Sequence, residues 1–340
     1  SEADQFFPIE LGSNPSIGGL LATNAGGSRT VRYGDAGSRL LGLEAVIADQ
    51  AGSTLGSIKG LVKDNSRLRV DRLFVGSFGA LGVISRIAVR TARLPRSVAA
   101  AFIQPPSHHE VLDILRLLET TFVHDIAAFE FISGDTIALA SSTTPGLRTP
   151  FGPDFRDIVL LEVSSSSVDK PALEEDLALQ LQRISSTPTV GGIEAVLAPP
   201  EEAWALRHAL SEGVMRGGDT IRFDVSVPRA RLSELRDFVV ERFSSESVVV
   251  SEFGHWGDGG THLSLVYPNR DRPESTDEIR ETIYDQVVVK LGGSFSSEHG
   301  LGRHNARFYE KYVPESERAM ARQLKKLLDP HSVWGTAPFA

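Results

Sequence analysis

The sequence contains no cysteine, and this absence excludes several kinds of chemistry. Disulfide bonds, thiol nucleophiles, iron–sulfur clusters and thiolate zinc sites all require that residue. A chain without disulfides fits a reducing compartment, so we expect a cytoplasmic location. The sequence also has no run of about 18 apolar residues that would predict a membrane-spanning helix. We expect no secretory signal peptide, because the sequence opens without a basic and then apolar segment.

Positive charge is in short supply, with 35 Lys and Arg against 44 Asp and Glu and a net charge of −9. An acidic protein is poorly suited to nucleic acid or an anionic membrane, so we predict neither as the main partner. Apolar residues make up 41% and charged residues 23%, as in an ordinary globular protein. The length of 340 residues predicts about two domains.

Two histidines, His255 and His262, flank a bend that is rich in glycine. Because strand side chains alternate, an unbroken strand would send positions seven apart to opposite faces. Glycine can break that alternation, and the bend would then aim both imidazoles into one cavity. With Glu298 they form a set that suits a catalytic divalent metal, typically zinc. A lone histidine is more often structural, but the pair and the glutamate favour the metal.

Two further residues, Asp258 and His299, lie close in the sequence to these proposed ligands, and their functions are considered separately. Asp258 lies in the bend and either orients a ligand or forms a local Asx-type turn; the residues favour neither. His299 follows Glu298 directly, and neighbours in extended backbone point apart, so the two residues have different functions. We predict that His299 is a general base, because an unperturbed pKa of about 6.5 suits proton transfer near neutrality.

Arg207, Ser211 and Arg222 are candidates for binding a substrate carboxylate. A guanidinium group binds a carboxylate in a two-point fork. Arg207 and Ser211 lie one turn apart on a predicted helix, and Arg222 shares a strand face with Asp224. From the residues alone, a surface pair of Arg222 with Asp224 is the simpler interpretation.

Two stretches near the start, 17–27 and 73–84, are dense in glycine. Such backbone can approach a ligand closely, and its N–H groups can hold phosphate. The spacing is not the G-x-G-x-x-G of a nicotinamide-binding fold. A glycine-rich turn region without a ligand is an equally good interpretation of the composition.

Beyond residue 95 the pattern alternates between helices and strands, which predicts an α+β domain with an antiparallel sheet. The expected strands are 127–132, 158–164, 220–227 and 248–253, and the expected helices are 108–121, 170–183, 200–215, 230–243, 275–290 and 314–328.

The glycine-rich stretches, Gly18-Gly19 through Tyr33-Gly34 and then Gly76-Ser77-x-Gly79-x-Leu81-Gly82, resemble the second half of a flavin domain. That domain belongs to the FAD-linked oxidases of the vanillyl-alcohol-oxidase superfamily. The Gly-His-x-Gly-Asp-Gly and Ser-x-Glu-His-Gly-x-Gly stretches resemble its D-2-hydroxyacid dehydrogenase branch. That branch includes D-2-hydroxyglutarate and D-lactate dehydrogenases and the glycolate oxidase flavoprotein subunit.

The resemblance implies three parts. Residues 1–95 would be the second part of an FAD-binding domain whose first part precedes Ser1 in the family. Residues 96–290 would be a substrate-capping domain with helices on one face of its sheet, and 291–340 an active-site loop and a helix that returns to the flavin domain. The implied flavin contacts are Gly18, Gly19, Thr23, Asn24, Gly26, Gly27, Tyr33, Gly34, Gly76, Ser77, Gly79, Gly82 and Val83.

The implied activity is FAD-dependent oxidation of a D-2-hydroxy acid to the 2-oxo acid. Arg207, Ser211 and Arg222 would hold the substrate, a divalent metal would orient it, and an electron acceptor that the sequence does not identify would take the electrons. A homodimer is a candidate state. One alternative is a flavin-free fragment or metal-binding module, since we expect weak FAD binding without the first part of the domain. Another is a flavoenzyme like alkyl-dihydroxyacetone-phosphate synthase, which carries His at the place of Glu298.

Overall fold

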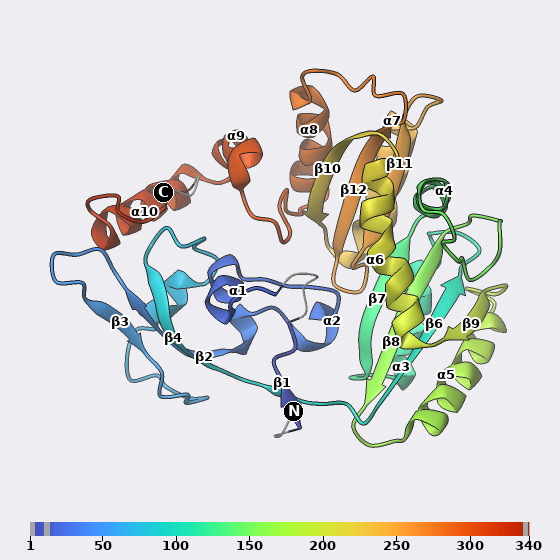
Figure 1. The fold of residues 1–340 in the computed structure, drawn as a ribbon, viewed down its shortest axis with the longest axis horizontal. Helices are drawn as coiled ribbons and strands as arrows, with labels where there is room; N and C mark the ends of the chain where they lie inside the picture. Colours follow the sequence, from blue (N-terminus) through green and yellow to red (C-terminus); the bar gives the residue numbers. More distant parts are fainter. Residues whose placement is uncertain (1–3, 10–13, 336–338, 340) are drawn as a thin grey trace. The chain divides into compact units, whose positions relative to one another are not determined.

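The computed structural model describes residues 4–9, 14–335 and 339. The chain forms two compact units, one of residues 1–93 with 298–340 and one of residues 94–297. We had predicted divisions after residues 95 and 290; the structure divides after Arg93 and after Ser297. Figure 1 shows the first unit in blue and red and the second in green to orange.

The second unit contains a seven-stranded sheet in the order β10-β12-β11-β7-β8-β6-β9, with every neighbouring pair antiparallel. Its strands are β6 (Ser97–Gln104), β7 (Ile126–Ile132), β8 (Ile158–Ser165), β9 (Glu194–Ala198), β10 (Asp219–Ser226), β11 (Val249–Gly254) and β12 (Gly260–Tyr267). The central strands β7 and β8 are buried along their whole length.

Three helices of this unit, α4, α5 and α6, begin at a capping side chain or at a proline. Asp169 accepts a hydrogen bond from the N–H of Ala172 at the start of α5, and Ser133 does the same for Thr136 at the start of α4. The helices are α3 (Val111–Thr121), α4 (Gly134–Thr143), α5 (Lys170–Ser185), α6 (Pro200–Arg216), α7 (Leu232–Phe243) and α8 (Asp277–Tyr284), which continues as a π turn over Asp285–Lys290.

The predicted class, α+β with an antiparallel sheet, is confirmed. Helices pack on both faces of this sheet, whereas we predicted helices on one face. Helices α4 and α6 pack on the face that carries Phe253, and α6 crosses that face in yellow in Figure 1. The next residue back, Glu252, points to the other face. There Arg236 of α7 donates to Glu252 Oε2 over 3.1 Å. Burial on both faces explains why β7 and β8 are almost continuously apolar.

The first unit is smaller and has its own core. Its three-stranded antiparallel sheet has the order β3-β2-β4, and a second strand pair joins β1 to β5. Leu21, Leu43 and Phe74 form the centre of the core, and Leu328 of the last helix packs there too. The elements are β1 (Gln5–Phe6), α1 (Ile17–Thr23), α2 (Thr30–Tyr33), β2 (Leu40–Val46), β3 (Thr54–Ser57), β4 (Val83–Val89), β5 (Ala92–Arg93), α9 (Gly302–Tyr312) and α10 (Glu315–Leu328).

The stretch around Gly18-Gly19 is helical, although its glycine content is typical of a turn region. It forms helix α1, which Ser16 caps by accepting the N–H of Gly19 and which Asn24 ends in a left-handed conformation. Glycine disfavours a helix, but the burial of Leu20 and Leu21 outweighs that preference.

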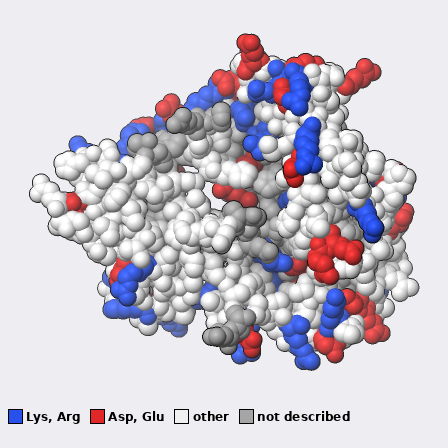
Figure 2. Space-filling model, viewed as in Figure 1, with Lys and Arg blue, Asp and Glu red and all other residues white. Residues whose placement is uncertain are grey.

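No helix in the described part of the chain combines the length and the apolar character that crossing a membrane requires. On the face of the second unit that Figure 2 shows, acidic and basic side chains are interspersed without a broad basic area. A mixed surface of this kind offers no single-sign field for steering a highly charged polymer.

Candidate active site

The bend between β11 and β12 brings the two predicted histidine ligands together. Phe253 pairs with His262 across the two strands, and His255 comes directly after β11. The carbonyl of His255 accepts the N–H groups of Asp258 and Gly259, which closes the turn. As a result the two imidazole rings lie edge to face, with their centroids 5.2 Å apart.

Gly259 and Asp258 set the shape of this turn. Gly259 has a φ of +101°, and a Cβ atom there would lie 2.4 Å from the carbonyl oxygen of Val227. Only glycine combines that conformation with that approach. The Oδ1 atom of Asp258 accepts the N–H of Gly260 over 2.9 Å. This contact is the Asx-type turn that was one of the two roles considered for Asp258.

A buried carboxylate, Glu130 of β7, holds His255. Its Oε1 atom lies 2.6 Å from Nδ1 of His255, and its Oε2 atom accepts from Nε of Arg207 over 2.7 Å. Burial alone would raise the pKa of Glu130, but the charges and hydrogen bonds of His255 and Arg207 outweigh it and lower the pKa to about 2. Glu130 is therefore an anion that joins the two residues.

His262 has a carboxylate beside the same ring atom. Its Nδ1 atom lies 3.5 Å from Oδ1 of Asp224, its partner on β10. A carboxylate near Nδ1 orients an imidazole so that Nε2 faces a ligand, which is the usual arrangement around zinc. Both rings therefore have a carboxylate at Nδ1, but the contact of His255 is a hydrogen bond and that of His262 is a longer ion-pair distance.

The third predicted ligand, Glu298, follows a segment that is attached to β10. Ser294 bridges to Ser226, and the N–H of Ser297 donates to the carbonyl of Asp224 over 3.0 Å. Glu298 is the next residue in the chain. His255 and His262 belong to the second unit and Glu298 to the first, so a shared ion at the three residues stays a prediction. Two imidazoles and one carboxylate are a donor set that fits zinc.

The predicted substrate residues lie on the same sheet face as His262. Cross-strand partners share a face, so Phe253, His262 and Asp224 point to one side, and Arg222 points there from the same strand as Asp224. Arg207 reaches this face from α6, with its guanidinium 4.6 Å from the centre of the Phe253 ring.

The three residues predicted to bind the substrate differ in burial and in contacts. Arg207 is 7% exposed, and its hydrogen bond to Glu130 uses Nε, so both Nη atoms stay available for a carboxylate fork. Ser211, one turn further along α6, is exposed, as is Arg222, whose Nη1 atom contacts the sulfur of Met215. The contact of Asp224 with His262 replaces the surface pair considered for Arg222.

His299, the predicted base, is exposed and belongs to the first unit, as does the half-buried Glu298. Gly300 follows with a φ of +69°, and a Cβ atom there would clash with the ring of Phe78. The backbone at this position is therefore restricted to glycine.

The two glycine-rich stretches predicted to contact flavin lie side by side in the first unit. The carbonyl of Leu21 accepts the N–H of Gly76 over 3.0 Å, and that of Ala22 accepts the N–H of Phe78 over 2.8 Å. The predicted flavin residues of the first stretch are Gly18, Gly19 and Thr23 of α1, Asn24, Gly26 and Gly27 after it, and Tyr33 and Gly34 at the end of α2. Those of the second stretch are Gly76, Ser77, Gly79 and Gly82, with Val83 starting β4.

The backbone of these stretches leaves room for a ligand in some places and is packed in others. Gly79 has a φ of +75° and open space where a Cβ would be, and the buried Oγ1 atom of Thr30 has no hydrogen-bond partner among the described residues. These features fit a cofactor. Ser77 instead donates to the carbonyl of Phe74, and a Cβ on Gly82 would meet the carbonyl of Val46.

Glu130 is a site residue that was not predicted from the sequence. Its signal was a single charged residue inside the otherwise apolar strand 126–132. A charge is almost never fully buried without a partner, so this position pointed to an ion pair or a ligand nearby.

A family model described as FAD linked oxidases, C-terminal domain, matches residues 94–334. The chain therefore belongs to the FAD-linked oxidase family. The mitochondrial D-2-hydroxyglutarate dehydrogenase of Rattus norvegicus is 33% identical over 98% of this chain and 61% of that protein. The enzyme of the same name from Arabidopsis thaliana is 31% identical over 96% of this chain and 58% of that protein. The chain thus spans about three fifths of the length of these relatives.

Solved structures share the fold. An alkyldihydroxyacetonephosphate synthase has a TM-score of 0.61 at 15% identity, over 93% of this chain and 56% of that one. A p-cresol methylhydroxylase has a TM-score of 0.59 at 14% identity, over 91% of this chain and 66% of that one. At this identity the likeness extends to the fold and not to the reaction.

Proposed function

We propose that this chain is part of an FAD-dependent enzyme that oxidises a D-2-hydroxy acid to the 2-oxo acid. The observation that carries the proposal is the link His255–Glu130–Arg207, which joins a zinc-type ligand to a carboxylate-binding arginine on one sheet face. Membership of the FAD-linked oxidases and the names of the relatives support the same reaction. D-2-hydroxyglutarate is the first substrate to test, because the rat relative is named for it.

Two arginines position the substrate in this proposal. Arg207 presents its Nη atoms, and its position is fixed by the buried Glu130. Arg222 lies on the same face and is exposed, so it can reach a second acidic group. Ser211 adds a hydroxyl one helical turn from Arg207. A rigid fork of this kind orients a carboxylate better than a point charge does.

The donor set of His255, His262 and Glu298 would hold a divalent metal, with zinc the best match. When bound, that ion would polarise the 2-hydroxyl group and lower the free energy needed to remove its proton. Glu130 and Asp224, each beside an Nδ1 atom, would leave the Nε2 atoms of the two imidazoles for the ion.

His299 takes the proton of the 2-hydroxyl group in this mechanism. No side chain of this sequence can accept a hydride, so a bound FAD would supply that chemistry, and an external electron acceptor would be needed. The glycine-rich stretches with Gly76 and Gly79 would hold the cofactor in the first unit. Homodimer formation and a cytoplasmic location stay predictions.

The proposal is tested on the protein as its gene encodes it. We expect a flavin absorption band in the visible spectrum, about one zinc-type ion bound at the proposed ligands, and reduction of the flavin by D-2-hydroxyglutarate or D-lactate but not by the L-isomers. His262→Ala should lose the ion, while His124→Ala, an exposed histidine on another surface, should keep it. A colourless protein that binds zinc would instead favour a metal-binding module.

A further inference from the structure

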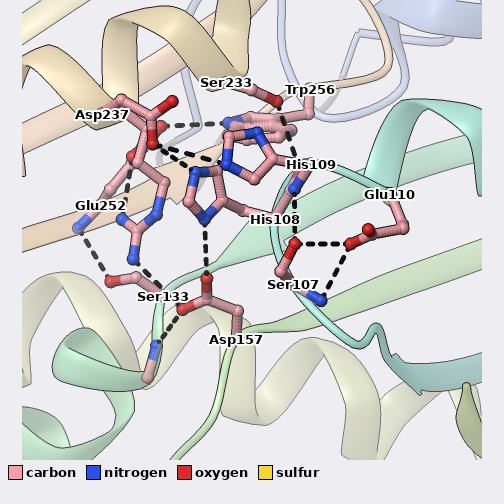
Figure 3. Close-up of polar contacts among 12 residues, drawn as sticks. Ser107, His108, His109, Glu110, Ser133, Asp157, Ser233, Asp237, Glu252 and Trp256 are labelled. Atoms are coloured by element: carbon pink, nitrogen blue, oxygen red, sulfur yellow. Dashed lines mark hydrogen bonds and ion pairs between the residues drawn. The ribbon is translucent and has the colours of Figure 1, made fainter. Parts of the chain in front are cut away.

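A second group of metal-ligating side chains lies within the second unit, apart from His255 and His262. His108 and His109 precede helix α3, and Asp237 projects from helix α7. Figure 3 shows the two imidazoles next to each other beside the carboxylate of Asp237, and their planes are tilted by 36°. The ring centroids are 4.2 Å apart, and His109 and Asp237 are exposed, so solvent ions can reach the group.

The separations of the donor atoms lie on either side of those around a tetrahedral ion. Oδ1 of Asp237 lies 2.8 Å from Nε2 of His108 and 3.8 Å from Nε2 of His109. All three residues offer ligand atoms within 4.8 Å of one another. Bonds of about 2.0–2.1 Å to zinc place tetrahedral ligands about 3.3–3.4 Å apart, between the two measured values. Small side-chain rotations would therefore make room for the ion.

The group has a second carboxylate behind it. Oδ2 of Asp157 lies 3.9 Å from Nδ1 of His108, the ring atom that faces away from Asp237. The other oxygen of Asp157 accepts from the N–H of Gly134 and from Nη2 of Arg236. The separation of Asp157 from His108 is an ion-pair distance rather than a hydrogen bond, but it places a carboxylate on the side of the ring where metal-ligating histidines usually have one.

The backbone that carries the two histidines is also fixed. The carboxylate of Glu110 accepts from both the N–H and the hydroxyl of Ser107, and the hydroxyl of Ser233 donates to the carbonyl of His108 (Figure 3). Arg236, one residue before Asp237, is held between Asp157 and the buried Glu252. Both sides of the group are therefore in place before an ion arrives.

We propose that His108, His109 and Asp237 form a second binding site for a zinc-type divalent cation, with a water molecule as the expected fourth ligand. Two imidazole nitrogens and one carboxylate oxygen suit zinc and related transition metals rather than calcium or magnesium, which take oxygen ligands. An ion bound here joins the segment before α3 to helix α7. It does not take part in the proposed oxidation.

The test counts bound zinc under limiting free zinc in the wild type and in three variants: His109→Ala, His262→Ala and the double variant. We expect two ions in the wild type, one in each single variant and none in the double variant. Removing a ligand should lower zinc affinity at its site by more than the roughly 10–100-fold that follows the loss of a ligand's hydrogen-bonding partner. His124→Ala and Glu241→Gln, an exposed carboxylate on α7, serve as controls.

The outcomes separate this site from the first one. If the proposed function is wrong about its metal, the wild type and His262→Ala bind one ion each and His109→Ala binds none, which still supports the second site. If His109→Ala and Asp237→Asn bind as much zinc as the wild type, the second site is overturned. In the His262→Ala background, zinc should raise the unfolding temperature, and adding His109→Ala should abolish that rise.

Discussion

The Nδ1 atom of His255 lies 2.6 Å from Oε1 of Glu130, a carboxylate that is fully buried in the sheet. The second oxygen of the same carboxylate accepts from Arg207. One anion therefore positions a proposed metal ligand and a proposed substrate anchor together. A change at Glu130 should affect metal binding and substrate binding at once.

Glu130→Gln should lower zinc affinity at His255 and His262 by about 10–100-fold, because a neutral amide makes His255 a weaker ligand. The measurement is competitive zinc titration in the His109→Ala background. Glu162→Gln is the matched control, since Glu162 is a buried glutamate of the neighbouring strand that accepts from the indole of Trp204. Unchanged zinc affinity in Glu130→Gln would show that Glu130 does not orient the ligand.

Arg207→Ala and Arg222→Ala should separate substrate binding from stability. Each should raise KM by about tenfold or more with a smaller change in kcat, because a hydrogen bond to a charged group contributes about 1.5–3 kcal/mol. Only Arg207→Ala removes one of the two partners of a buried carboxylate and leaves His255 as the other, so it should also lower the free energy of unfolding, by up to about 3–5 kcal/mol. Arg207→Lys keeps the charge, so it should be more stable than Arg207→Ala. Its KM should still be well above that of the wild type, because lysine cannot form the two-point fork. Equal stability of the two alanine variants would contradict this division.

His299→Ala should lower kcat by roughly 10²–10⁴-fold and leave metal content near that of the wild type. The pH profile of kcat/KM should lose its acidic limb, because the residue that must be deprotonated is gone. Glu298→Ala should instead lose metal. The reverse pattern, with metal lost in His299→Ala and kept in Glu298→Ala, would assign the ligand to His299 and the base to Glu298.

Asp329→Asn should destabilise the protein near neutral pH, and the deficit should shrink in acid. Burial would raise the pKa of Asp329, but hydrogen bonds from Lys325 and from the N–H groups of Val333 and Trp334 lower it below the ordinary 3.8. The stability from this carboxylate is therefore present above about pH 4 and is lost as the pH falls through the lowered pKa. Denaturant unfolding at pH 7, 5 and 3 measures the difference in free energy of unfolding between the wild type and Asp329→Asn. Asp154→Asn, at an exposed position, is the control. If this difference in free energy grew at low pH, the ionised carboxylate of Asp329 would not be the source of the stability.

Local patterns were enough to predict the long helices of the second unit. Helix α6 was expected over 200–215 and spans Pro200–Arg216, because Pro200 fits the first turn and apolar residues recur at helical spacing. Strand β12 was missed, since its glycine-rich start looks like a loop, and so was α1, where burial outweighs the low helix propensity of glycine. Such elements depend on partners distant in the chain, which a local pattern does not contain.

The sequence by itself determined the kinds of chemistry open to this protein. Without cysteine only imidazole and carboxylate donors remain for a zinc-type ion, and the spacing of His255, His262 and Glu298 was enough to single them out. Only the tertiary structure decided that His255 and Arg207 of α6 meet at Glu130 of β7, and that His108 and His109 face Asp237. These residues are 77 to 129 positions apart in the chain, and it is the antiparallel pairing of strands and the packing of helices on both sheet faces that bring them into contact.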